Sequence, residues 1–86
     1  MSETIHRFEI PVDGAWHEVA GAGYELLHVA GRTLGKVEFW AWARPQALVR
    51  RFRVYGTGEP VEGDVLYWGT IIDPRGYLVW HLVEAL

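Results

Sequence analysis

Short apolar and aromatic runs alternate along the chain with turns that contain glycine or proline. The runs are rich in Val, Ile, Trp, Tyr and Phe, a composition typical of strands. In the first run, apolar Phe8 and Ile10 alternate with Arg7 and Glu9, which predicts a strand with one buried face. The pattern predicts an all-β domain, a small antiparallel sheet or sandwich of about six strands, with at most one helical turn at 45–49. The expected strands cover residues 5–12, 16–20, 24–31, 35–44, 50–56 and a long C-terminal hairpin.

The C-terminal hairpin is predicted from residues 65–86, "VLYWGTIIDPRGYLVWHLVEAL". Its turn falls at residues 73–76, where proline has the fixed φ that the turn needs and glycine accepts a positive φ. Leu78, Leu82 and Leu86 are spaced by four residues, so a helix over 77–86 is the competing interpretation. The β-branched and aromatic residues of "YLVWHLV" favour a strand instead.

Several predicted strands are apolar on both faces, which is unusual for a sheet that is covered on one side only. In residues 77–83, apolar side chains occupy both alternating sets of positions. The second face is therefore expected to meet another sheet or another protomer. Because an uncovered apolar edge strand promotes aggregation, we expect a homo-oligomer in which Trp80, His81 and Leu82 lie at the interface.

Composition limits the classes of protein that the chain can represent. Its 86 residues suffice for a single domain, residues 1–86, with one core. The formal charge of −3 argues against DNA binding. The absence of cysteine excludes disulfides and thiol chemistry and agrees with a reducing compartment. Without a signal peptide pattern or a membrane-length apolar segment, the sequence predicts a soluble, cytoplasmic protein with no membrane partner.

Catalytic motifs are poorly represented. The only serine is Ser2, and no histidine has the closely spaced partner that is typical of a metal site. No metal and no cofactor are therefore expected. His28 and His81 are the candidates for a general base and its partner, if they meet across a sheet; a structural role in the core or an interface is the commoner outcome. Strand alternation directs four glutamates to solvent: Glu9, Glu18, Glu25 and Glu38.

The segment "FRVYGTGEP", residues 52–60, contains two glycines that flank a threonine. Consecutive backbone N–H groups in such a loop can bind an anion. A nucleotide-hydrolase phosphate loop also needs a lysine and a following helix, however, and here Glu59 and Pro60 follow. A turn that closes the strand at 50–56 is the favoured interpretation.

Arginines and tryptophans suggest a binding site rather than a catalytic one. Guanidinium groups bind phosphates in a bidentate manner, and indole rings stack on bases. The strands at 35–44 and 50–56 are joined by a short loop and are expected to be neighbours. The alternative is a solvated edge on which arginine stems cover the indoles. The predicted ligand-binding residues are Trp40, Trp42, Arg44, Arg51, Arg53, Tyr55, Gly56, Thr57 and Gly58.

The segments "FEIPV", "LLHVAG", "FWAWARP", "FRVYGTGEP", "YWGT" and "LVWHLVEAL" together resemble an uncharacterised family of small phage and prophage proteins. The resemblance spans nearly the whole chain and implies no defined activity. A looser resemblance, in size and source, connects the chain to phage proteins that sequester nucleotide signals of bacterial immunity. Those signals include cyclic ADP-ribose derivatives and cyclic dinucleotides.

Three functions follow as hypotheses. The first is a non-enzymatic protein that binds and withholds a small nucleotide-derived signal in the cytoplasm of an infected bacterium. The second is an interaction module whose apolar face docks on a host or virion protein. The third is a phosphodiesterase in which His28 or His81 acts as the base.

Overall fold

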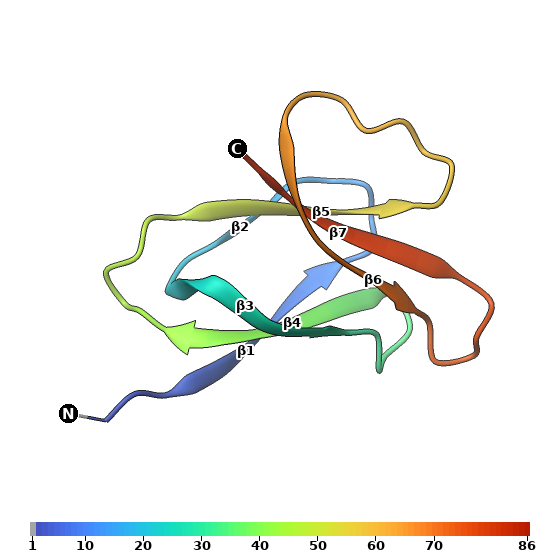
Figure 1. Ribbon diagram of the computed structural model, residues 1–86. Helices are drawn as coiled ribbons and strands as arrows, with labels where there is room; N and C mark the ends of the chain where they lie inside the picture. Colours follow the sequence, from blue (N-terminus) through green and yellow to red (C-terminus); the bar gives the residue numbers. More distant parts are fainter. Residues whose placement is uncertain (1) are drawn as a thin grey trace.

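The computed structural model describes residues 2–86 and shows two antiparallel sheets packed face to face (Figure 1). A three-stranded sheet has the order β1-β4-β3, and a four-stranded sheet has the order β2-β5-β7-β6. The strands are β1 (Ile5–Pro11), β2 (His17–Val19), β3 (Ala22–Ala30), β4 (Lys36–Ala43), β5 (Arg50–Gly56), β6 (Val65–Ile72) and β7 (Val79–Ala85).

The all-β prediction is confirmed, with seven strands rather than six, because the C-terminal hairpin contributes two of them. The alternative helix over 77–86 is wrong, since β7 occupies this segment. No helix forms among the described residues at 45–49 either; the Ala47 N–H donates to the Arg44 carbonyl at 2.9 Å, which closes a single turn.

The core lies between the two sheets and is built from alternating side chains of their inner faces. Phe39 of β4 and Phe52 of β5 are fully buried, and their ring centres lie 4.9 Å apart across the sandwich. Phe8 stacks on Phe39 at 5.1 Å from the β1 side. Burial of each such ring contributes on the order of 2 kcal/mol, so these aromatic contacts hold the layers together.

The predicted hairpin turn between β6 and β7 is present. The Gly76 N–H donates to the Asp73 carbonyl at 2.9 Å, and Gly76 has a φ of 81°. The Asp73 carboxylate accepts the N–H groups of Tyr77 at 2.8 Å and Leu78 at 3.2 Å. Burial would raise the pKa of Asp73, but these hydrogen bonds outweigh it and hold the pKa below its usual value.

The placement of β7 corrects the reasoning behind the predicted interface. β7 pairs with β6 on one side and with β5 on the other, so the edge that was expected to need a partner protomer is covered within the chain. Leu82 is fully buried and Trp80 packs against the core, while His81 lies on the outer face. The Trp80 and Leu82 face of this strand therefore meets the other sheet, while the face with His81 and Val83 points outward, and self-association stays a prediction.

An ion pair inside the sandwich was not anticipated. Arg50 contacts both carboxylate oxygens of Glu84, at 2.7 and 2.8 Å, and donates to the Gly23 carbonyl of β3 at 2.6 Å. The Trp68 indole also donates to Glu84, at 2.9 Å. Burial tends to raise the pKa of Glu84, but Arg50 and Trp68 outweigh this effect and lower it. The pair thereby connects the two sheets through polar contacts.

Candidate functional site

The predicted ligand-binding residues are divided between the two outer faces of the sandwich. Trp40 and Trp42 belong to β4, which pairs with β1 and β3. Arg51, Arg53 and Tyr55 belong to β5, which pairs with β2 and β7. The expectation that these two strands are neighbours was wrong, because the short 44–49 connection crosses between the sheets instead of closing a hairpin.

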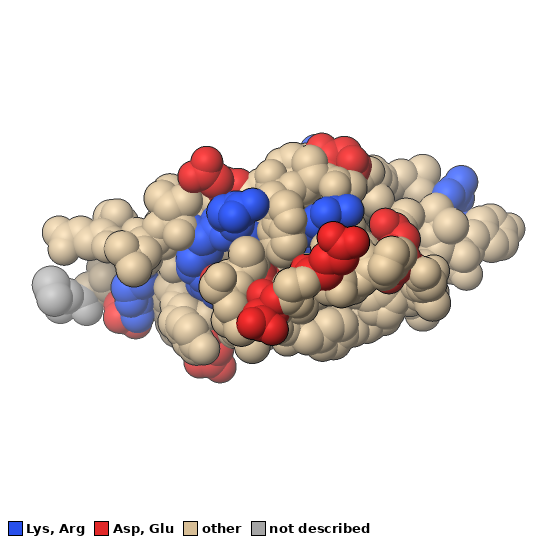
Figure 2. Space-filling model, turned by 90° about the horizontal axis from the view of Figure 1, so that it is seen from above, with Lys and Arg blue, Asp and Glu red and all other residues tan. Residues whose placement is uncertain are grey.

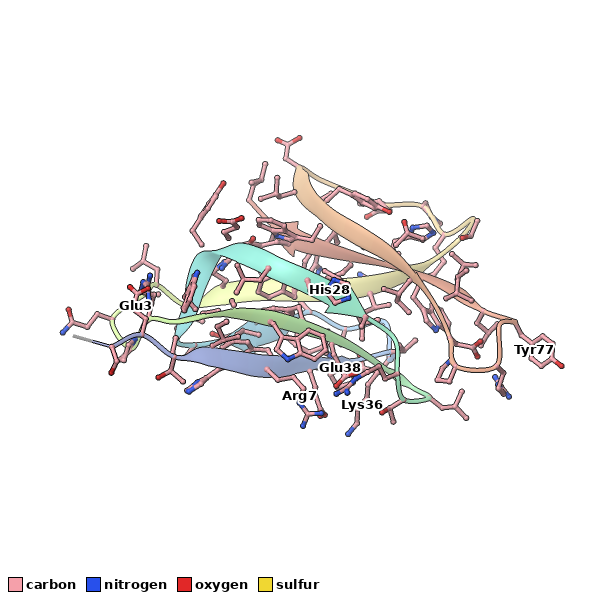
Figure 3. The ribbon with its side chains drawn as sticks, turned by 60° about the horizontal axis from the view of Figure 1, so that its bottom comes forward. Glu3, Arg7, His28, Lys36, Glu38 and Tyr77 are labelled. Atoms are coloured by element: carbon pink, nitrogen blue, oxygen red, sulfur yellow. The ribbon has the colours of Figure 1, made fainter. Side chains whose placement is uncertain are left out.

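The outer face of the three-stranded sheet is filled by ion pairs. Glu38 is only 1% exposed. Its carboxylate accepts one hydrogen bond from Arg7 and two from Arg32, each at 2.9 Å. Lys36 pairs with Glu9 at 2.9 Å beside them. Figure 3 shows Arg7, Lys36 and Glu38 gathered together on this face.

Glu38 is thus buried rather than directed to solvent as alternation alone predicted. Its position does alternate outward, but the Arg7 and Arg32 side chains cover it. Hydrogen bonding from Arg32, supported by Arg7, overcomes the effect of burial and lowers the pKa of Glu38 to about 2. The other three glutamates of that prediction, Glu9, Glu18 and Glu25, are exposed.

Trp40 and Trp42 have neighbours that already occupy this face. The Arg32 guanidinium lies 5.3 Å from the Trp40 ring centre, and the His28 ring lies 5.9 Å from it. Trp42 stands opposite Ile5 of β1 in the strand register. These indoles do not face Arg51 or Arg53.

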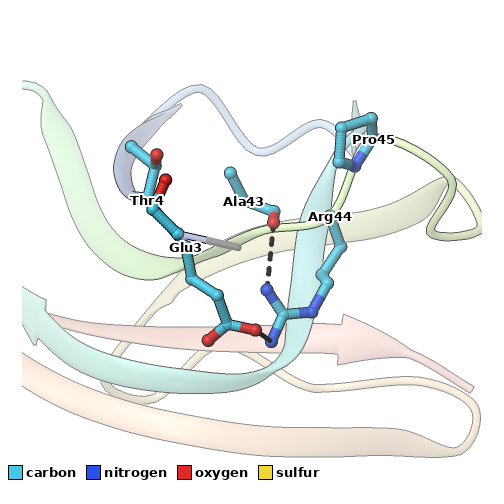
Figure 4. Close-up of a pocket in the computed structure, with 6 residues that line it drawn as sticks. Glu3, Thr4, Ala43, Arg44 and Pro45 are labelled. Atoms are coloured by element: carbon cyan, nitrogen blue, oxygen red, sulfur yellow. Dashed lines mark hydrogen bonds and ion pairs between the residues drawn. The ribbon is translucent and has the colours of Figure 1, made fainter.

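Arg44 lies apart from the other predicted arginines of the site. It pairs with Glu3 at 3.0 Å and donates to the Ala43 carbonyl at 3.1 Å, in a hollow of about 660 Å³ near the N-terminus (Figure 4). Glu3 therefore already neutralises the cation that was expected to bind phosphate.

The Gly56-Thr57-Gly58 segment forms a turn at the end of β5. The Gly56 N–H donates to the Glu59 carboxylate at 2.7 Å, and the Glu59 N–H donates to the Gly56 carbonyl at 3.2 Å. Gly58 has a φ of 94°, which a glycine adopts readily. The Glu59 carboxylate thus already accepts the hydrogen bond of the Gly56 N–H, so the segment is not a phosphate loop.

Two arginines on the outer face of the four-stranded sheet differ from all the others. Among residues 2–86, Arg51 and Arg53 are the only Lys or Arg side chains that form no ion pair with a carboxylate. Both point outward, because they alternate along β5 with the buried Phe52 and Val54. The buried Nε of Arg53 also has no hydrogen-bond partner.

An aromatic ring lies next to each of these arginines. The Arg51 guanidinium carbon is 5.4 Å from the Trp16 ring centre, and that of Arg53 is 4.4 Å from the Tyr55 ring centre. Trp16 was not predicted as a site residue, because it reaches β5 only through the β2–β5 pairing, which no local pattern reveals.

His81 lies on the same face, directly opposite Tyr55 in the register. Its Nε2 is 2.8 Å from the Thr57 hydroxyl, and its Nδ1 is 3.0 Å from the Thr70 hydroxyl and 3.2 Å from the Tyr67 hydroxyl. His28 is on the other sheet, so the two histidines do not meet. We call the outer face that carries Trp16, Arg51, Arg53, Thr57, Tyr67, Thr70 and His81, together with the buried Tyr55 ring that Arg53 covers, the arginine face.

One acidic residue lies at the border of the arginine face. Glu18 stands opposite Arg51 in the β2–β5 register, but the two side chains form no ion pair. Seen from above the molecule, charged side chains form small groups among mostly neutral surface (Figure 2). The positive charge of the arginine face is therefore local, in a chain whose formal charge is −3.

Fold and site together define a two-sheet all-β protein with an uncompensated arginine pair on one outer face. The chain belongs to the family described as "Domain of unknown function (DUF7352)", which matches residues 1–86. No curated protein and no solved structure matches it. Within residues 2–86 there is no helix that could cross a membrane and no group of side chains arranged to hold a metal ion.

Proposed function

We propose that the arginine face binds a small nucleotide-derived anion, such as an ADP-ribose derivative or a cyclic dinucleotide, and holds it without transforming it. The observation that carries the proposal is the pair Arg51 and Arg53, which lack a carboxylate partner although every other cation of the described chain has one. A phosphorylated ligand supplies the missing negative charge.

The spacing of the two arginines suits a ligand with more than one anionic oxygen group. Residues two apart on a strand lie roughly 6–7 Å apart on the same face. Each guanidinium can donate two parallel hydrogen bonds to a phosphate. Trp16 and Tyr55 orient the arginine planes, and the partly exposed Trp16 offers ring surface to a base, whereas the Tyr55 ring is buried.

The hydroxyl groups around His81 complete the binding surface. Thr57, Thr70 and Tyr67 each provide a donor and an acceptor. A pentose, which carries hydroxyls of its own, can exchange hydrogen bonds with this group. The face thus combines the three contacts that a nucleotide requires, namely phosphate, sugar and base.

The biological setting is part of the proposal. The resemblance to small phage and prophage proteins, and the looser one to proteins that withhold immune signals, support a sequestering role in the cytoplasm of an infected bacterium. A binder of this kind competes with the host receptor and needs no catalytic group.

Isothermal titration calorimetry against a panel of cyclic dinucleotides and ADP-ribose derivatives tests the proposal. We expect binding by the full chain and a loss of roughly tenfold or more in Arg53→Gln, since a charge-assisted bidentate contact disappears. Arg75→Gln, which removes a cation paired with Asp73 in the β6–β7 turn, is the matched control. Absence of heat with every ligand contradicts the proposal.

A single contact favours hydrolysis as a second candidate. The Thr57 hydroxyl lies 2.8 Å from His81 Nε2, and groups at Nδ1 orient the ring, which is the arrangement of a nucleophile and its base. Ligand recovered intact after incubation and heat denaturation supports binding alone. Ligand that the wild type cleaves but that is recovered intact with Thr57→Val supports hydrolysis.

A further inference from the structure

We infer that a hollow beside the Gly56–Glu59 turn receives the planar ring of the same ligand, so the ligand is an extended nucleoside diphosphate or a derivative of one. The inference rests on the proposed function, because Arg53 holds the anionic end. It adds where the ring lies and how long the ligand must be.

The hollow has a volume of about 430 Å³, and none of its lining side chains is charged. Trp80 packs against the core and therefore provides a fixed aromatic wall, whereas Tyr77 is 79% exposed and can close over a ligand. The residues that line the hollow are Gly56, Thr57, Tyr77, Leu78, Val79 and Trp80. Planar apolar rings are the groups that such walls bind best.

Gly56 keeps this hollow open. A Cβ at this position would lie 3.2 Å from the Trp80 ring and 2.9 Å from the Glu59 carboxylate, so any larger residue would displace one of these side chains. The turn hydrogen bond from the Gly56 N–H to Glu59 holds the carboxylate at the turn. The sequence motif that first suggested a phosphate loop thus shapes an apolar recess.

Thr57 links the hollow to the arginine face. It lines the hollow and also contacts His81 Nε2 at 2.8 Å. Thr70 and Tyr67 follow on the far side of the His81 ring. Thr57 therefore joins the apolar recess to the outer face of β5, which carries the arginines, whereas Thr70 and Tyr67 lie on β6, on the other side of β7.

The distance between the two ends selects the ligand class. Arg53 and Thr57 are four residues apart, which corresponds to about 13 Å along an extended chain. A ring joined directly to a phosphate cannot reach both ends. A base, a pentose and a diphosphate in sequence can span from the hollow to Arg53, with the pentose beside Thr57.

The larger hollows of the molecule do not suit this role. Those of about 660 and 670 Å³ share Arg44 and Pro45, and Glu3 already neutralises Arg44. Glu3 and Tyr77 lie at opposite ends of the molecule (Figure 3). A ligand held by Arg53 is therefore far from these two hollows, whereas the recess at Thr57 begins at the end of the same strand.

Calorimetry of the full chain with ADP, pyrophosphate and adenosine tests the inference. We expect ADP to bind roughly tenfold tighter than pyrophosphate, because base stacking adds to the anion contacts. Leu78→Asn should lower ADP affinity to the level of pyrophosphate while leaving pyrophosphate affinity unchanged. Leu48→Asn, at an exposed leucine that does not line this hollow, should leave both affinities unchanged.

The outcomes separate this inference from the proposed function. Equal affinities for ADP and pyrophosphate in the wild type, both lost in Arg53→Gln, overturn the ring site and leave the anion site standing. Binding of neither probe overturns both. If Leu78→Asn unfolds, Tyr77→Ala serves instead, because the exposed Tyr77 side chain contributes little to the core.

Discussion

The two outer faces of the sandwich use arginine in opposite ways. On the three-stranded sheet, Arg7 and Arg32 surround Glu38, and that carboxylate is almost completely covered. On the four-stranded sheet, Arg51 and Arg53 face no carboxylate partner and lie over aromatic rings. The first arrangement is complete without a ligand, whereas the second leaves hydrogen-bond donors available.

The difference has an energetic meaning. Hydrogen bonds to a charged group contribute about 1.5–3 kcal/mol each, so the Glu38 cluster is expected to stabilise the fold. A cation over a ring contributes about 0.5–1 kcal/mol at an exposed site and about 2 kcal/mol where the pair is desolvated. Tyr55 is buried, so the Arg53 contact adds to stability, but neither Arg51 nor Arg53 has a carboxylate partner, which is the reason to assign them to binding.

Glu38→Ala should have the largest effect. It removes the acceptor that Arg7 and Arg32 share, although Arg7 keeps its contact with Glu9, so we expect the free energy of unfolding to fall by about 2 kcal/mol. Urea denaturation followed by tryptophan fluorescence measures this change. A decrease below about 0.5 kcal/mol would show that the cluster is not structural.

The lowered pKa of Glu38 predicts that the stability of the fold depends on pH. Because its pKa is lowered to about 2 in the folded protein, from 4.5 in an unperturbed glutamate, Glu38 adds stability that is fully present above pH 4.5. That stability is lost as the pH falls toward 2. In Glu38→Gln, urea titrations between pH 5 and pH 2 should show a shallower decline than in the wild type; parallel profiles contradict the assignment.

A matched pair of substitutions compares the faces directly. Arg32→Gln should lower the free energy of unfolding, since it breaks the two contacts to the covered Glu38 carboxylate. Arg53→Gln should change it less, because it breaks no ion pair and loses only the contact with the buried Tyr55 ring. Thermal unfolding of both variants in one buffer tests the comparison. Equal losses of stability would show that the two faces do not differ in how their arginines contribute to the fold.

Glu18→Gln should have the smallest effect and the opposite sign. Glu18 faces Arg51 in the strand register without pairing to it, so its charge repels an anionic ligand. Removing that charge is expected to raise ligand affinity about twofold to threefold at low salt, and less at 0.5 M salt because of screening. Calorimetry at the two salt concentrations checks both statements; a lower affinity at low salt contradicts them.

The sequence was sufficient for most of the fold. Alternation and turn residues are local signals, and they located the strands and the 73–76 turn to within a few residues. The pairing partners were harder to predict, because β5 pairs with β7 and β1 with β4 across long stretches of chain. The short 44–49 loop suggested a hairpin, but loop length alone cannot distinguish a hairpin from a crossing between sheets.

The same limitation explains the partial success at the candidate site. Arg51, Arg53, Tyr55 and Thr57 share one strand or its end, and the alternating pattern of that strand was enough to group them. Trp16 and His81 join them only through strand pairing. Trp40 and Trp42 were included because they are near in sequence, although the structure places them on the opposite face.

The ion pair between Arg50 and Glu84 restricts how this sequence can change over evolutionary time. Either residue substituted alone leaves the other buried charge unpaired, at a cost of roughly 3–5 kcal/mol, which approaches the whole stability of a small domain. Both replaced together by apolar residues of similar volume can be neutral. Relatives of this chain should therefore retain both residues or lose both, with single-site intermediates rare.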